Sequence, residues 1–162
     1  MIREHKFAKK KMCMSELSNF LNDRGYRQLP MTRSVVGHFH TKGTVNGRAV
    51  EILVDTGAAC TCVALTVVRE LGISCERVDD AASGAGGAFE QFRVEGAILC
   101  LGGFTPRVST LAGFDFEHVN ASLRANGSAE VDMILGVDVF DAHAAIIDYE
   151  TQSLFLKEIV DR

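Results

Sequence analysis

One carboxylate stands out because of its place in the sequence. Asp55 directly follows the apolar run Ile52-Leu53-Val54 and precedes Thr-Gly-Ala at positions 56–58. Such a run is typical of a buried strand, and the glycine permits a tight turn after it. The acid is therefore presented where a core strand ends. The residues alone leave two interpretations open: an acid for general acid–base chemistry, or one that only shapes a turn.

Three segments together resemble a known family. The run 52–58 resembles the active-site loop of retropepsin-like aspartic proteases. Ile134-Leu135-Gly136, before a short helix expected at 137–142, resembles the second loop of these enzymes, and the glycine-rich segment 83–88 resembles their flap. The three features follow one another in the order found in the family. The resemblance covers residues 35–157.

The resemblance implies a role for each of these segments. Asp55 would be the catalytic residue. The other implied site residues are Thr56, Gly57 and Ala58 in the active-site loop, Gly84, Ala85, Gly86 and Gly87 in a flap that binds substrate, and Ile134, Leu135 and Gly136 in the second loop. The implied activity is that of an aspartic-type endopeptidase, a hydrolase acting on a polypeptide substrate.

The number of suitable acids predicts two copies of the chain. Hydrolysis by this route uses two carboxylates around one water molecule. The chain holds one Asp-Thr-Gly; Asp138 and Asp141 fall in a predicted helix, and Asp148 falls within a predicted strand. A two-fold homodimer is the simplest way to pair Asp55 with its own copy.

The sequence also departs from the family pattern. Ala59 stands where many members have a hydroxyl or carboxylate residue that supports the loop, and Thr61 is a candidate substitute. The N-terminal extension and the polar end 158–162 could replace or obstruct the pairing of chain ends seen in several dimeric members. An alternative function is therefore a catalytically inactive module that keeps the fold for dimerisation or peptide binding.

Cysteine and histidine residues offer two rival chemistries. Cys60 and Cys62, with His38 and His40, have the alternation of a strand face, but structural zinc ligands usually occur as turn-based pairs. No spacing selects the thiolate–histidine pair that a cysteine protease needs. We expect no metal and no cofactor, and we expect His143 to be packed rather than catalytic.

The elements around these residues predict a mainly β protein. Asn46-Gly47, between the strand-like segments 37–45 and 48–54, predicts a hairpin that leads into Asp55. Many short strands with glycine-rich turns predict the retropepsin-like acid protease fold, a closed β-barrel-like domain with short helices. We expect this domain at 35–162 and an N-terminal helical extension at 1–34, with a helix at 15–24 capped by Ser15.

Composition narrows the classes of function. The 162 residues are 47% apolar and carry a net charge of −4, which disfavours nucleic acid as a partner. Neither a secretory signal nor a stretch long enough to cross a bilayer is evident, so no membrane partner is expected. Five cysteines at irregular spacing indicate free thiols and a cytoplasmic location.

Overall fold

Strands dominate the secondary structure. The computed structural model describes residues 15–84, 87–108 and 110–159, with the backbone alone at 79–84 and 87–89. The described helices are α1 (Glu16–Asn22), α2 (Leu65–Glu70), α3 (Glu117–Ala125) and α4 (Val137–Ala142). None of the helices in these ranges is both long and apolar enough to cross a bilayer.

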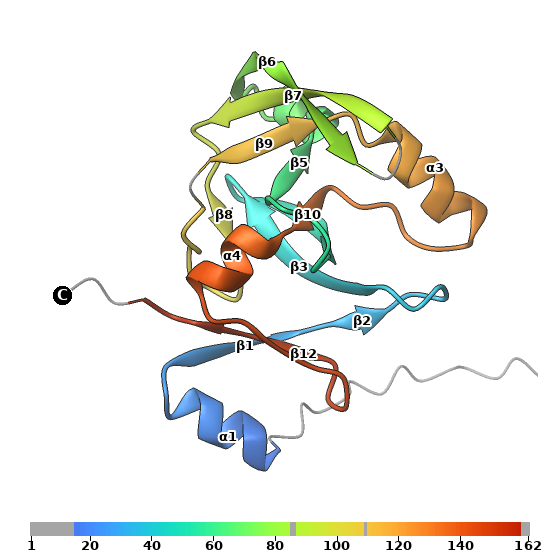
Figure 1. Ribbon diagram of the computed structural model, residues 1–162. Helices are drawn as coiled ribbons and strands as arrows, with labels where there is room; N and C mark the ends of the chain where they lie inside the picture. Colours follow the sequence, from blue (N-terminus) through green and yellow to red (C-terminus); the bar gives the residue numbers. More distant parts are fainter. Residues whose placement is uncertain (1–14, 85–86, 109, 160–162) are drawn as a thin grey trace, which may run out of the picture.

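A large sheet carries most of the chain (Figure 1). Its strands pair in the order β2-β3-β4-β10-β5-β9-β7-β6, and β8 pairs with β3. These strands are β2 (Thr32–Arg33), β3 (Phe39–Val45), β4 (Arg48–Val54), β5 (Cys62–Ala64), β6 (Ser74–Gly84), β7 (Gly87–Glu95), β8 (Leu99–Cys100), β9 (Leu111–Phe114) and β10 (Met133–Leu135). The prediction of a mainly β domain is confirmed, although the described strand order runs from β2 to β6 without closing into a barrel.

A second, three-stranded sheet joins the two ends of the described chain. Its order is β1-β12-β11, formed by β1 (Tyr26–Pro30), β12 (Ser153–Lys157) and β11 (Ile146–Asp148). In Figure 1 this sheet lies below the larger one, with α1 beneath it. Sequence patterns placed the first strand signal at residue 35, whereas β1 and β2 begin earlier and pair with β12 and β3.

Helix α1 forms where the sequence predicted it. The Ser15 hydroxyl accepts a hydrogen bond from the Ser18 N–H at 3.1 Å, which caps the helix. Of the apolar residues of this helix, Leu21 is buried, while 42% of Leu17 and 51% of Phe20 are exposed. The residues that α1 buries are Ser18 and Leu21, so its buried stripe is narrow.

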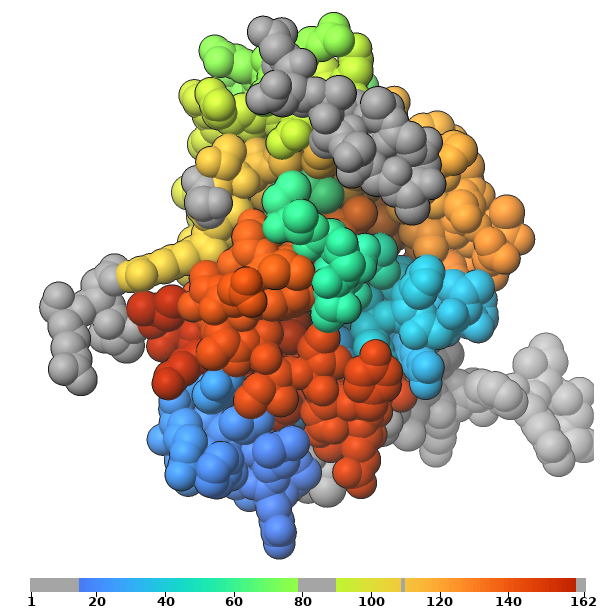
Figure 2. Space-filling model, viewed as in Figure 1, coloured from blue at the N-terminus to red at the C-terminus, as the bar shows by residue number. Residues whose placement is uncertain are grey.

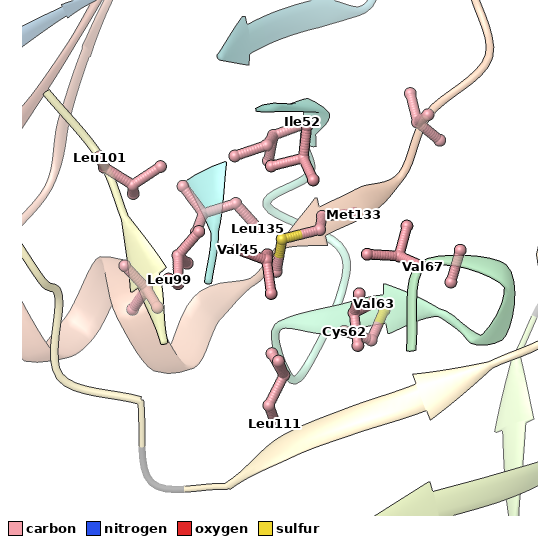
Figure 3. Packing of buried hydrophobic residues seen from close by; sticks show 14 of the residues in the cluster. Val45, Ile52, Cys62, Val63, Val67, Leu99, Leu101, Leu111, Met133 and Leu135 are labelled. Atoms are coloured by element: carbon pink, nitrogen blue, oxygen red, sulfur yellow. The ribbon is translucent and has the colours of Figure 1, made fainter. Parts of the chain in front are cut away.

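The core lies between the strands that lead to the candidate site (Figure 3). Strands β4 and β10 run parallel, with Met133 opposite Ile52 and Leu135 opposite Val54. Ile52, Met133 and Leu135 are fully buried, whereas Leu53 and Ile134 on the other face are half-buried. Burial of these alternate side chains stabilises both strands and fixes their register.

The hairpin expected at Asn46-Gly47 is present. β3 and β4 are antiparallel and pair without interruption from Val45–Arg48 to Phe39–Val54. Asn46 has φ 47° and Gly47 has φ 84°, the two positive angles that this tight turn requires. Further along, β8 covers only Leu99–Cys100, and β9 begins at Leu111.

Candidate active site

Asp55 lies immediately after β4, as the sequence predicted, and is half-buried. Its N–H donates to the Leu135 carbonyl at 3.1 Å, which continues the β4–β10 ladder by one residue. Its carboxylate oxygen Oδ1 accepts from the Gly57 N–H at 2.8 Å. The carboxylate is therefore held by its own loop while remaining within reach of solvent.

The loop after Asp55 turns tightly. The Ala58 N–H donates to the Asp55 carbonyl at 3.2 Å, and Thr56 and Gly57 are exposed at the surface. A Cβ atom at Gly57 would lie 3.2 Å from Asp55 Oδ1. Glycine thus allows this N–H to approach the carboxylate closely.

The second predicted loop lies directly against the first. Ile134 and Leu135 are in β10, and Gly136 caps the N-terminal end of α4. A Cβ at Gly136 would lie 2.6 Å from the Cys60 carbonyl and 2.8 Å from the Ala58 carbonyl oxygen, closer than real Cβ contacts occur. Only glycine fits here, and the Val137 N–H donates to the Ala58 carbonyl at 2.9 Å.

Thr61 connects the two loops, a point that the sequence had left open. Its hydroxyl donates to Asp138 Oδ1 at 2.7 Å and accepts from the Gly136 N–H at 3.0 Å. The Thr61 N–H also donates to Asp138 Oδ1 at 2.8 Å. Because Thr61 is fully buried, these bonds are shielded from water. Ala59 is exposed and takes no part in this network.

Asp138 is a site residue that sequence reasoning missed. It was placed in a helix and set aside, yet it accepts both Thr61 bonds from the first turn of α4. Its other oxygen, Oδ2, is buried and has no hydrogen-bond partner among the described residues. The available signal was an acid two residues after a loop glycine, but the direction of the Asp138 side chain depends on how α4 packs.

The two cysteines beside the loop are poor nucleophiles. Burial raises the pKa of the Cys62 thiol to about 12. Burial, and then the nearby Asp138 carboxylate, also raise the pKa of Cys60. Both side chains are therefore protonated near neutral pH, and a thiol is much less nucleophilic than a thiolate. This argues against the cysteine-protease alternative at this site.

The histidines are held by other parts of the protein. His143 is buried; its Nδ1 lies 2.7 Å from the Lys157 carbonyl oxygen, and its Nε2 accepts from the Arg107 N–H at 2.8 Å. His40 is also buried and lies 3.3 Å from Glu51. In the part of the chain that the structure describes, no three His, Cys, Asp or Glu side chains gather as metal ligands would.

The predicted flap is the end of a long hairpin. β6 and β7 are antiparallel, and Gly84 pairs with Gly87 at the last described position. Ala85 and Gly86 lie outside the described residues. The register shifts between Val78 and Ala82, so the pairing is irregular before the tip. A substrate-binding role for these glycines stays a prediction.

Comparison with known families identifies the same stretch of chain. The sequence profile of a family described as aspartyl protease matches residues 41–139, which include the Asp55 loop, the flap hairpin and the second loop. No curated protein sequence matches this chain.

Solved structures with a related fold include three proteases or protease-like domains. A retroviral protease-like domain of Ddi1 from Leishmania major is 19% identical, covers 74% of this chain and 88% of its own, and has a TM-score of 0.50. A retropepsin-like aspartic protease from Rickettsia conorii is 17% identical and has a TM-score of 0.48; the match covers 81% of this chain and 90% of that one. EIAV protease, complexed with the inhibitor HBY-793, is 19% identical and has a TM-score of 0.49; the match covers 68% of this chain and 91% of that one.

Proposed function

The chain belongs to the aspartyl protease family, and we propose that it is an endopeptidase that hydrolyses peptide bonds with water activated between the Asp55 carboxylates of a homodimer. The observation that carries this proposal is the setting of Asp55. It sits in a tight loop after a core strand, half-buried, with Oδ1 bound by the Gly57 N–H.

The proposed chemistry divides two roles between identical residues. One Asp55 carboxylate accepts a proton from the water molecule, and the other, protonated, donates to the carbonyl of the scissile peptide. Two neighbouring carboxylates share one proton because both ionise together only at a high electrostatic cost. Neither a metal nor a cofactor is needed for this step.

In the described part of the chain, two other acids considered for the second carboxylate, Asp138 and Asp148, accept hydrogen bonds from their own neighbours. Asp138 Oδ1 accepts hydrogen bonds from the N–H and the hydroxyl of Thr61. Asp148 accepts from the Thr151 hydroxyl and from the Glu150 N–H at 2.9 Å. A two-fold axis beside the Asp55 loop supplies the missing group with the correct symmetry.

The proposed substrate is an extended polypeptide. A strand-like peptide can be held by backbone hydrogen bonds between the Asp55 loop and the hairpin that ends at Gly84 and Gly87. We place the protein in the cytoplasm, where reducing conditions keep thiols such as Cys60, Cys62, Cys75 and Cys100 free.

Cleavage of a mixture of unfolded proteins from about pH 3 to about pH 7 tests this function. We expect acid-favoured cleavage that falls by about 10³-fold or more in Asp55→Asn, a near-isosteric change that removes the general base. The rate of the wild-type protein should rise faster than linearly with its concentration. A folded, dimeric wild type that binds peptides without cleaving them would replace the protease with a peptide-binding module.

A further inference from the structure

His143 is buried, and both of its ring nitrogens are bonded to the backbone of other segments. Only 2% of the residue is exposed. Its Nε2 accepts a hydrogen bond from the Arg107 N–H at 2.8 Å, and its Nδ1 lies 2.7 Å from the Lys157 carbonyl oxygen. A backbone N–H can only donate and a carbonyl can only accept. The two partners therefore fix the ring in the neutral form that carries its proton on Nδ1.

The ring joins three parts of the fold. His143 caps the C-terminal end of α4, Lys157 is the last residue of β12, and Arg107 lies between β8 and β9. The Phe104 ring packs edge-on against the imidazole, with ring centroids 5.7 Å apart. We call residues 104–107 the clasped segment. Figure 2 shows it (yellow) beside the end of β12 (red) and α4 (orange-red).

The clasped segment is anchored at its two ends. At the first, Phe104 and Leu101 exchange backbone hydrogen bonds of 2.8 and 3.0 Å. At the second, the Arg107 N–H is bonded to the imidazole, and residues 105–107 belong to no helix or strand. The chain then enters β9, which pairs with β5 after the Asp55 loop and with β7 of the β6–β7 hairpin. A change in the segment can therefore reach both sides of the candidate site.

Protonation of His143 is incompatible with this arrangement. The second ring proton would sit on Nε2 and face the Arg107 N–H, so two donors would meet and the hydrogen bond would be lost. The charged imidazole would also be buried, which costs free energy unless an anion pairs with it. Histidine ordinarily changes its charge between about pH 5 and about pH 8. The bond is thus made at the upper end of this range and is lost as the pH falls.

The charged groups around the ring leave it without a bonded carboxylate. Arg107 and Lys157, which supply the two backbone partners, are both cationic residues. Glu158 lines the same pocket as the ring and pairs with Arg27 at 2.9 Å, and Asp141 is exposed on α4. Because backbone groups occupy both ring nitrogens, neither carboxylate is bonded to the imidazole. A proton taken up by the ring therefore gains no ion pair without a rearrangement.

A pocket of about 330 Å³ adjoins the ring and the clasped segment. Its lining includes Thr105, Arg107, His143 and Glu158. A volume of this size holds several water molecules, at about 30 Å³ each. Water in the pocket can deliver the proton to the ring, and the segment has space to move when its bond to the ring is lost.

We propose that His143 is a proton-sensitive clasp: the neutral imidazole holds residues 104–107 against α4 and β12, and protonation releases them. The clasp does not depend on the proposed hydrolysis, because it consists of a hydrogen bond that can be followed without substrate. The acidification that favours the proposed cleavage also frees the segment that leads into β9. Proton concentration is thereby linked to the support of the β6–β7 hairpin.

NMR spectroscopy of the full-length, isotope-labelled protein tests the clasp. Nitrogen shifts of the His143 ring report its tautomer and protonation, and the Arg107 amide signal reports the bond. We expect a neutral ring with its proton on Nδ1 at about pH 7.5, and an Arg107 amide shift that follows the ring with the same midpoint on acidification. Protection of this amide from hydrogen exchange, corrected for the intrinsic rate, should fall by up to about tenfold per pH unit below that midpoint, because the released state binds one more proton.

His143→Gln and His118→Gln form a matched pair. A glutamine oxygen can accept from the Arg107 N–H but does not titrate, whereas His118 is exposed on α3. The pH response of the Arg107 amide should disappear in His143→Gln and persist in His118→Gln. A response that persists in His143→Gln would overturn the inference. If His143→Gln does not fold, the two wild-type midpoints still decide, since a constant Arg107 amide or a different midpoint would also overturn it.

Asp55→Asn separates the clasp from the proposed function. This variant should lose cleavage and keep the pH response of the Arg107 amide. If the wild type cleaves nothing but the amide follows the His143 ring, the clasp stands and the protease does not. If the wild type cleaves and the amide ignores the protonation of the ring, the protease stands and the clasp does not.

Discussion

The two hairpins β3–β4 and β6–β7 differ in how firmly the rest of the protein holds them. The first pairs continuously, is flanked by β2 and β8 on one side and β10 on the other, and has its turn fixed by the Asn46 side chain. The second has a register shift, and its strand β6 lies at the end of the large sheet.

This difference fits the tasks proposed for the two hairpins. A general base must be held in one geometry, and β4 delivers Asp55 from a strand paired on both sides. A hairpin that admits and releases a peptide needs a lower cost of local opening, and an edge strand has fewer hydrogen bonds to break. Substitutions around Asp55 should therefore cost more stability and activity than substitutions on the β6–β7 hairpin.

The largest effect is expected at Gly136. Gly136→Ala would place a methyl group 2.6 Å from the Cys60 backbone, so the two loops must separate. We expect the free energy of unfolding to fall by about 3 kcal/mol and cleavage to drop sharply. Urea unfolding and peptide cleavage measure the two effects. Gly127→Ala is the control, because Gly127 has φ +68° and open space around it. This substitution should lower the free energy of unfolding by about 1 kcal/mol and leave cleavage unchanged.

Removal of the Thr61 hydroxyl should have the next largest effect. Thr61→Val deprives the buried Gly136 N–H of its acceptor and Asp138 Oδ1 of a donor. We expect a loss of about 2 kcal/mol of stability. The rate constant kcat should fall more than KM changes, because the Asp55 loop is displaced while the peptide surface remains. Thr61→Ser retains the hydroxyl and should restore most of kcat; equal kcat in both variants would show that the hydroxyl has no positioning role.

The Asn46 turn should affect stability without affecting catalysis. Asn46→Ala removes the bonds to the Gly96 carbonyl and the Ile98 N–H and leaves alanine at φ 47°. We expect a loss of about 1.5 kcal/mol with unchanged kcat, measured by thermal unfolding and peptide cleavage. Asn46→Gly loses the same two side-chain bonds but tolerates the positive φ angle. The difference in stability between Asn46→Gly and Asn46→Ala therefore isolates the backbone contribution. A large fall in kcat would mean that the turn also positions Asp55.

The smallest effect is expected on the β6–β7 hairpin. Arg77 and Glu90 form an ion pair at 2.8 Å, but their side chains are 64% and 62% exposed. Solvent screening limits such a pair to about 0.5 kcal/mol at most. A double-mutant cycle with Arg77→Ala and Glu90→Ala measures it, and high salt should abolish it. A coupling energy well above this value would place the hairpin among the firmly held parts of the fold.

Some elements could be predicted because their signals are local. Asn46-Gly47 specifies a tight turn through its own backbone preferences, and the Ser15 cap and the helix that it starts are likewise local. Gly136 before α4 was identified through the resemblance to a family, which preserves the order of such segments. No comparable local signal marks β1 and β2, which are short, lie on either side of Met31 and include Pro30.

The sequence by itself determined the position of Asp55 at the end of an apolar strand, the turn before that strand and the glycine that the second loop requires. Tertiary structure alone decided that β1 pairs with β12, that Thr61 points to Asp138, and that Tyr149 packs against Phe39. The physical reason is distance along the chain. Turns and caps depend on neighbouring residues, whereas these contacts join residues 77 or more positions apart, as for Thr61 and Asp138, and form only when the whole core packs.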